Sequence, residues 1–154
     1  MKKGVLTIYF FGKKTEIDSK EKEYLRRINF RCKADLIPLS QAGVKDPSAA
    51  KKLEAEKLLP KIDDNEYLIV WDERGKSMDS IVFSQFIGKQ IEEWGSLVFV
   101  IGGAHGVDES IRQRANKLVK ASDMIWTRNL FRLMSLEQLY RALEIQGGSN
   151  FHKE

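Results

Sequence analysis

A glycine-rich segment directly follows the most apolar stretch of this chain, and it is the first candidate for a ligand site. Residues 97–101 are all apolar and run into Gly102-Gly103-Ala104-His105-Gly106. Ligands of open α/β sheets bind beyond the carboxyl ends of strands, and glycine lets backbone groups approach them closely. The spacing is not the dinucleotide-binding fingerprint, which follows a first strand. The segment therefore predicts either a small-molecule site or a tight strand-to-helix turn.

The end of the chain carries a second set of reactive side chains. Its last four residues are Phe151, His152, Lys153 and Glu154. An imidazole can accept or donate a proton near neutral pH, and an ammonium group can stabilise a developing anion. Terminal tails are often disordered, so the same residues also fit a solvated end without a function.

Basic side chains in the last third of the chain form a third candidate. The net charge of +4 leans toward anionic partners such as nucleic acid. Arginine suits phosphate well, although a solvated helix face is an equally simple reading for any one residue. We expect these side chains on two successive helices: Arg112, Arg114, Lys117 and Lys120 on the first, and Arg128, Arg132 and Arg141 on or before the second.

The composition excludes several classes of protein. A single cysteine, Cys32, rules out a disulfide within the chain and fits a reducing cytosol. With His105 and His152 as the only histidines, no cluster has metal-ligand spacing, so we expect no metal. No apolar run approaches about 18 residues, and the N-terminus does not resemble a signal peptide. We therefore expect a cytoplasmic protein without a membrane span.

The pattern of apolar residues predicts an α/β fold. Strands and helices alternate five times, which is typical of a mostly parallel sheet. We expect one domain over residues 1–154, with a sheet of five to six strands. The predicted strands are 5–11, 33–39, 67–71, 97–101 and 124–126, and the predicted helices are 19–28, 48–59, 79–94, 108–119 and 130–146.

The last predicted helix is apolar on more than one side. Its large apolar side chains do not form one narrow stripe, as expected for a helix covered on two faces. We favour a position between the sheet and a second subunit, hence a homodimer, over a position deep in a monomer core. These side chains are Leu130, Leu133, Met134, Leu136, Leu139, Tyr140, Leu143 and Ile145.

Four motifs in a fixed order give the chain a resemblance to a known family. A first strand ends in Gly12-Lys13, Glu23–Arg27 reads Glu-Tyr-Leu-Arg-Arg, residues 99–106 read Phe-Val-Ile-Gly-Gly-Ala-His-Gly, and residues 137–142 read Glu-Gln-Leu-Tyr-Arg-Ala ahead of the tail. Over essentially its whole length, the chain resembles the ribosomal RNA large subunit methyltransferase H family, a minimal SPOUT protein. The resemblance implies a homodimer with a C-terminal trefoil knot. It also implies methylation by S-adenosyl-L-methionine (SAM) at N3 of a pseudouridine in large-subunit (23S) ribosomal RNA, on assembled ribosomes.

The resemblance also implies roles for individual residues. SAM would sit in the knot, held by three loops, and the tail would supply His152 and Lys153 as catalytic residues. Arg26, Arg27, Arg128 and Arg141 would contact RNA or the partner subunit. The implied cofactor residues are Trp71 in the first loop, Gly102 and Gly103 in the second, and Ala121, Ser122, Asp123, Met124, Ile125 and Trp126 in the third.

The chain departs from the family pattern at two places. The usual tail is Tyr-His-Arg-Glu, so Phe151 lacks a hydroxyl and Lys153 lacks the planar fork of arginine. The usual Thr-Leu-Pro-His before the last helix is here Ile125-Trp126-Thr127-Arg128. These changes keep two alternatives open: a non-catalytic knotted RNA-binding protein, or a SPOUT methyltransferase with another RNA target. A nucleotide-dependent oxidoreductase is disfavoured because no glycine fingerprint follows the first strand.

Overall fold

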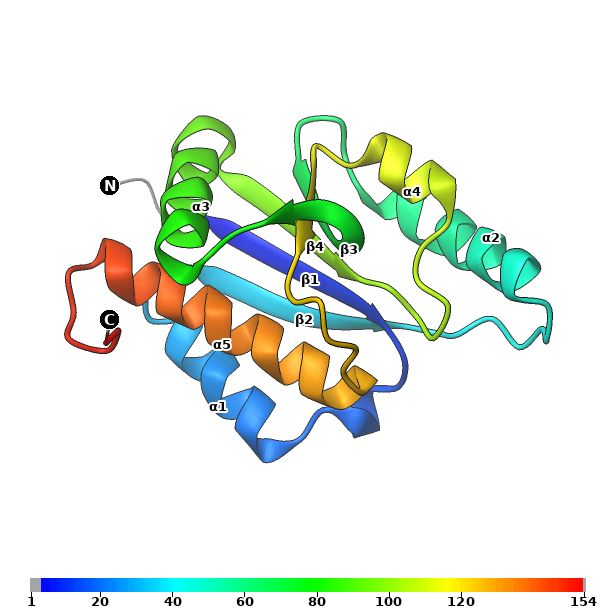
Figure 1. Ribbon diagram of the computed structural model, residues 1–154, viewed down its shortest axis with the longest axis horizontal. Coiled ribbons are helices and arrows are strands. Elements are labelled where there is room, and N and C mark those ends of the chain that lie inside the picture. Colours follow the sequence, from blue (N-terminus) through cyan, green and yellow to red (C-terminus); the bar gives the residue numbers. More distant parts are fainter. Residues whose placement is uncertain (1–3, 154) are drawn as a thin grey trace.

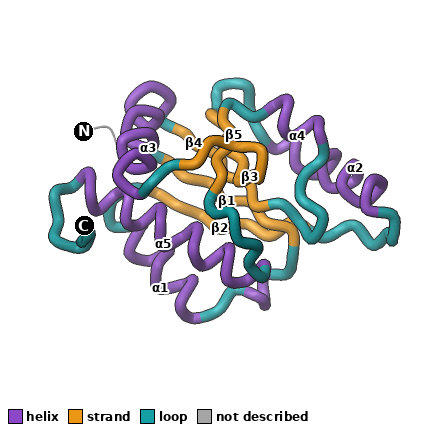
Figure 2. Tube along the Cα trace, viewed as in Figure 1, coloured by secondary structure: helices purple, strands orange, loops and turns teal. Residues whose placement is uncertain are grey.

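A computed structural model describes residues 4–153 and contains one five-stranded sheet (Figures 1 and 2). All neighbouring strands are parallel, and their order is β2-β1-β4-β3-β5. This confirms the predicted α/β class and the mostly parallel sheet. The strands are β1 (Val5–Phe11), β2 (Lys33–Leu39), β3 (Tyr67–Ser77), β4 (Ser96–Ile101) and β5 (Lys117–Lys120).

Helices cover both faces of the sheet. On one face α1 (Ser19–Ile28), α3 (Ser80–Trp94) and α5 (Arg128–Gln146) pack together, and on the other face α2 (Pro47–Leu58) lies beside α4 (Glu109–Arg114) (Figure 1). Side chains alternate along β1, so that Ile8 joins the core under the first layer and Tyr9 joins the core under the second. Covered faces explain why residues 68–71 of β3 and 97–101 of β4 are all apolar. Two short 3-10 helices, η1 (Lys14–Glu16) and η2 (Leu59–Lys61), follow β1 and α2.

Aspartate side chains set the start of four helices. Asp18, Asp46, Asp79 and Asp108 each accept a hydrogen bond from a backbone N–H in the first turn of the helix that follows. For α2 the cap is Asp46, so the helix begins one residue before the predicted 48–59, with Pro47 at the first helical position, where its missing N–H costs nothing.

The predicted strand over residues 124–126 is wrong. Ile125 is fully exposed and Met124 is 78% exposed, so this segment is a loop on the surface. The fifth strand is β5, which overlaps the end of the predicted helix 108–119. That helix ends early because Asn116 makes two hydrogen bonds to Leu68 of β3. The Asn116 N–H donates to the Leu68 carbonyl at 2.8 Å, and the Asn116 side-chain oxygen accepts from the Leu68 N–H at 2.8 Å.

The third strand is longer than the predicted 67–71, since β3 continues to Ser77. The pairing of β3 with β5 shifts in register between Trp71 and Lys76, which marks a bulge. Gly75 lies directly over β5, and a Cβ atom there would stand 2.5 Å from the carbonyl carbon of Leu118. Only glycine allows the two backbones to approach so closely.

Two further features concern the classes excluded by composition. Cys32 is buried, and burial raises the pKa of its thiol to about 11. Within residues 4–153, no helix has the length and apolar character needed to cross a membrane.

Candidate functional site

A cavity of about 760 Å³ opens where the carboxyl ends of β3, β4 and β5 converge. This is the edge at which open α/β sheets bind ligands. All nine residues predicted to hold a cofactor line this one cavity, although they come from three separate segments of the chain. The lining consists of Trp71, Asp72 and Glu73 within β3, Ile101 at the end of β4 and residues 102–106 after it, Lys120 at the end of β5 and residues 121–126 after it, and Arg112, Arg128 and Phe131 from the neighbouring helices.

The glycine loop after β4 closes tightly on itself. Gly103 and Gly106 form an isolated bridge, and Gly106 has a φ of 82°, which glycine adopts without strain. A Cβ atom on Gly102 would stand 3.0 Å from the carbonyl carbon of Gly106. A Cβ atom on Gly103 would stand 3.0 Å from Oε1 of Glu54, a buried carboxylate on α2. At Gly102 and Gly103 the loop therefore presents backbone rather than side chains to the cavity.

Aromatic rings form the apolar wall of the cavity. The ring centroid of Trp71 lies 5.5 Å from that of Phe83 and 5.9 Å from that of Phe131, and Trp126 lies 6.3 Å from Phe131. Trp71 is 8% exposed, and its buried indole N–H has no hydrogen-bond partner among the described residues. A buried donor without an acceptor is costly, so an acceptor on a ligand that reached this N–H would stabilise it.

Ion pairs hold the polar rim of the cavity in place. Nε of Arg112 donates to Oδ2 of Asp72 at 2.8 Å, and both side chains are largely buried. Lys120 pairs with Asp123 and lowers the pKa of that carboxyl through a hydrogen bond and its charge. Arg128 reaches the Phe11 carbonyl at 3.5 Å. Because the Asp72–Arg112 pair joins β3 to α4, it fixes the relative positions of two cavity walls.

The tail packs at the far end of α5. The Phe151 ring lies 4.8 Å from the Tyr140 ring, and the Arg141 guanidinium lies 4.8 Å from the Phe151 centroid. Arg141 also pairs with Glu137 and contacts Nδ1 of His152 at 3.0 Å. A guanidinium can only donate, so Nδ1 is the acceptor and the neutral ring carries its proton on Nε2. Lys153 is exposed.

The structure does not bring the predicted catalytic tail to the predicted cofactor cavity of the same chain. Arg128 lies at the cavity. Arg141, which is thirteen positions later on the same helix, contacts His152. A helix rises about 1.5 Å per residue, so the two sites are about 20 Å apart. No side chain spans that distance.

The predicted basic candidates divide into structural and surface groups. Arg132 is fully buried, bound by both carboxylate oxygens of Glu21, and it lies 4.5 Å from the Phe10 ring centroid, so its prediction as a phosphate ligand is wrong. Arg114 donates to the backbone carbonyls of Asp63 and Glu66. Lys117 and Lys120 lie on β5 and do not share a helix with Arg112 and Arg114, contrary to the prediction.

Arg26 and Arg27 remain on the surface of α1. Both donate to the carboxylate of Glu23, and these hydrogen bonds lower the pKa of that carboxyl to about 2. The Arg27 guanidinium also lies 5.7 Å from the ring centroids of Tyr24 and Tyr140. These contacts place Arg27 between α1 and α5.

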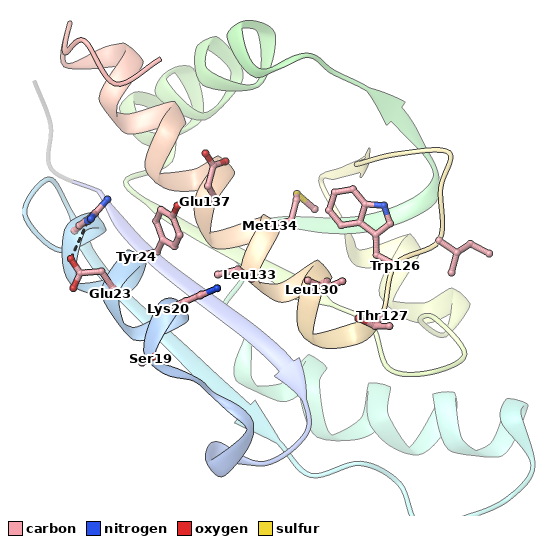
Figure 3. A pocket seen from close by; sticks show the side chains of 12 residues that line it. Ser19, Lys20, Glu23, Tyr24, Trp126, Thr127, Leu130, Leu133, Met134 and Glu137 are labelled. Carbon is pink, nitrogen blue, oxygen red and sulfur yellow. Dashed lines mark hydrogen bonds and ion pairs between the residues drawn. The ribbon is translucent and has the colours of Figure 1, made fainter. Parts of the chain in front are cut away.

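A second hollow, which the sequence did not reveal, lies between α1 and α5. It has a volume of about 1050 Å³ and a largely apolar floor (Figure 3). Ile125 and Trp126 line both this groove and the cavity after β5. The two-sided apolar pattern of α5 explains the groove: Leu139 and Leu143 face the core, while Leu130 is 58% exposed. The groove residues are Ser19, Lys20, Glu23, Tyr24, Arg27, Ile125, Trp126, Thr127, Leu130, Leu133, Met134 and Glu137.

Comparisons with known proteins agree with this geometry. The model of a family described as predicted SPOUT methyltransferases matches residues 5–152. Ribosomal RNA large subunit methyltransferase H of Pseudothermotoga lettingae is 38% identical over 132 residues, which cover 85% of this chain and 87% of the relative. The protein of the same name from Clostridium acetobutylicum is 36% identical over 157 residues, covering 96% and 99%. A probable methylase family protein from Haemophilus influenzae has a similar fold, with a TM-score of 0.59, 12% identity, and coverage of 96% of this chain and 68% of that chain.

Proposed function

The chain belongs to the SPOUT methyltransferase family, and we propose that it transfers a methyl group from SAM to N3 of a pseudouridine in large-subunit ribosomal RNA. The observation that carries this proposal is the convergence of three loops, from β3, β4 and β5, on one cavity. Relatives that align over most of their length are named as methyltransferases of this ribosomal RNA. The proposed place of action is the cytoplasm, on assembled ribosomes.

The cavity suits SAM in size and chemistry. A volume of about 760 Å³ lies in the range of small-molecule sites. The Trp71 and Trp126 rings offer apolar surface to an adenine, and the unpaired indole N–H of Trp71 offers it a donor. The backbone of Gly102 and Gly103 can approach a polar ligand closely. When bound, the sulfonium supplies an electrophilic methyl group.

We assign the removal of the proton from the target base to the tail. N3 of a pseudouridine must lose its proton as it attacks, and His152 would accept that proton. Lys153 would stabilise the negative charge that develops on the base. Because Arg141 occupies Nδ1 of His152, the ring becomes a base only after this contact breaks. Substrate binding would therefore have to draw Arg141 toward another acceptor, such as a phosphate.

We further propose that the chain acts as a homodimer through the groove between α1 and α5. A second copy would cover Leu130, Leu133 and Met134, which now face solvent at least in part. A two-fold axis across this groove would run the two α5 helices side by side in opposite directions. Each tail would then lie near the cavity of the partner, which removes the 20 Å gap within one chain.

The proposed fold includes the trefoil knot of the family. The close crossing of Gly75 over Leu118 supports it, because there the last part of β3 lies directly on the strand that leads into the last loop of the cavity. Knots are rare among proteins, so the crossing alone would not suggest one.

One observation favours a second candidate, a knotted RNA-binding protein without catalysis. Ile125 is fully exposed and Trp126 is 39% exposed. The loop that differs most from the family pattern is therefore a wall of the cavity whose large apolar side chains are exposed. A wall that does not close on the cofactor would abolish catalysis and leave the basic surface intact. SAM binding distinguishes the two candidates.

The experiment that tests the proposal is a calorimetric titration with SAM and with its demethylated product, followed by a methyl-transfer assay. The assay uses radiolabelled SAM and ribosomes that lack the modification. We expect one SAM molecule to bind per subunit, and we expect the label at a pseudouridine of the large-subunit RNA. A folded protein that binds neither ligand would establish the non-catalytic candidate, and label at another nucleotide would overturn the proposed target.

A tail variant separates catalysis from binding. His152→Ala should bind SAM as the wild type does and lose most of its turnover, typically by a factor of about 10² or more for a general base. His105→Gln, which removes the imidazole that lines the cavity of the same chain, is the comparison. If His105→Gln abolishes turnover and His152→Ala does not, the assignment of the proton acceptor is wrong.

A further inference from the structure

Five exposed or half-exposed lysines lie along the same edge of the sheet as the cavity. Lys13 and Lys14 follow β1, where the Gly12 N–H bonds to the Leu39 carbonyl at 2.8 Å and so ties the ends of β1 and β2 together. Lys45 precedes α2, and Lys51 and Lys52 lie in its first half. Since all strands are parallel, the ends of β1 and β2 lie at the edge where the cavity opens.

The lysines of α2 lie beside the glycine loop of the cavity. Glu54, one turn after Lys51, stands against Gly103. Hydrogen bonds from Ser110 lower the pKa of Asp108, and the charges of Lys51 and Lys52 lower it further, so both ammonium groups lie near the segment that leaves this loop. The Asp108 carboxylate is already bonded to the Ser110 hydroxyl at 2.6 Å.

The lysines after β1 lie on the opposite side of the cavity. Arg128, which lines the cavity, bonds to the Phe11 carbonyl at 3.5 Å and to Glu16 at 3.4 Å. These contacts join the segment Gly12–Glu16, and with it Lys13 and Lys14, to the cavity wall at the start of α5. The two groups of lysines therefore flank the cavity.

These lysines form no ion pair within the part of the chain that the structure describes. Among the described residues, none of the five ammonium groups has a carboxylate within ion-pair distance, whereas Lys120 pairs with Asp123 and Lys57 bonds to the Ser40 carbonyl at 3.0 Å. Ammonium groups without partners keep their full charge for an external anion. Because these ammonium groups lie on both sides of the cavity, they are placed to bind a linear chain of evenly spaced anions that passes across it.

We propose that this lysine rim, formed by Lys13, Lys14, Lys45, Lys51 and Lys52, binds the phosphates of RNA on both sides of the target nucleotide. The inference rests on the proposed function, because it takes RNA as the substrate and the cavity as the place of methyl transfer. Contacts of this kind position a substrate without reading its sequence. They also make binding strongly dependent on salt, since each neutralised phosphate releases a counterion.

The test measures binding of labelled protein to ribosomes that lack the modification, over a range of KCl concentrations. The double variant K51Q/K52Q removes two charges on one side of the cavity, and K13Q/K14Q removes two on the other side. The slope of log affinity against log salt is negative, and each variant should reduce its magnitude by about 1.5, at about 0.7–0.9 per phosphate contact. The matched control is K33Q/K61Q, which removes two exposed lysines from the opposite edge of the sheet, where β2 begins and before β3.

The methyl-transfer assay separates this inference from the proposed function. Where the wild type methylates ribosomes, the rim variants should raise KM, leave kcat nearly unchanged and leave SAM binding unchanged. Equal salt slopes for the rim variants, the control and the wild type would overturn the rim, and so would the absence of ribosome binding by the wild type. Binding that depends on the rim but produces no methyl transfer would keep the rim and overturn the proposed methyltransferase.

Discussion

Mixing two defective subunits should restore methyl transfer if the tail of one protomer serves the cavity of its partner. The first subunit carries His152→Ala and keeps an intact cavity. The second carries Gly102→Val, which places a branched side chain where a Cβ atom already meets the Gly106 backbone at 3.0 Å, and keeps an intact tail. Each homodimer should be inactive, the first for lack of a proton acceptor and the second for lack of a closed glycine loop.

The expected activity of the mixture follows from symmetry. Equal amounts of two subunits that pair at random give about one half mixed dimers. A mixed dimer has one site with an intact cavity and an intact partner tail, and one site with neither. The mixture should therefore reach about one quarter of the wild-type activity for the same total protein. If each tail served its own cavity, every site would carry one defect and the mixture would be inactive.

Co-expression of the two subunits with different affinity tags gives the assay, because it pairs the chains during folding and allows the mixed dimer to be purified. The purified mixed dimer should have about half of the wild-type turnover, since one of its two sites is intact. An inactive mixed dimer would refute the shared site, provided that calorimetry shows one SAM bound per dimer. A monomeric wild type would refute it more directly.

Three other results are expected from single features of the fold. Arg132→Met should lower the free energy of unfolding by about 3–5 kcal/mol because it leaves the Glu21 carboxylate buried without a cation, and adding Glu21→Gln should recover much of that loss in urea denaturation at one fixed protein concentration. Gly75→Ala should cost about 1–3 kcal/mol in the same measurement, since the new methyl group meets backbone that cannot rotate away. Arg31 lowers the pKa of Glu144 through a hydrogen bond, so Glu144 stabilises the protein above pH 4.5, and this contribution is lost as the pH falls through the lowered value. The free energy of unfolding of the wild type should therefore exceed that of Glu144→Gln by less below pH 4.5 than above it. A difference in unfolding free energy that is constant with pH would contradict this expectation.

Local patterns predicted the first two strands well. β1 and β2 have the predicted bounds, because each is a short β-forming run that ends at a residue typical of turns or strand ends. The cavity also followed from the sequence, since the glycine loop stands after the most apolar strand. The remaining cavity residues came from the family resemblance, as neither Trp71 nor the loop 121–126 carries a local signal of a ligand.

Interactions between distant residues explain the errors. Residues 117–120 continue a helical pattern, and they form β5 only because Asn116 binds Leu68, 48 positions earlier in the chain. The burial of Arg132 depends on Glu21, which lies 111 positions earlier. Periodicity within a segment carries no information about such partners, so the pattern predicted a longer helix in the first case and a free arginine in the second.

The positions of the three tryptophans give the cavity an optical signal of its own. Trp71 and Trp126 border the cavity and share the Phe131 ring, whereas Trp94 packs against Tyr67 at the opposite edge of the sheet, with ring centroids 5.4 Å apart. A ligand that stacks on the first two rings should quench their fluorescence and leave the emission of Trp94 unchanged. In a Trp94→Phe variant the whole emission would come from the two cavity rings, so that occupancy could be followed in milliseconds, without a labelled cofactor, as the loops close.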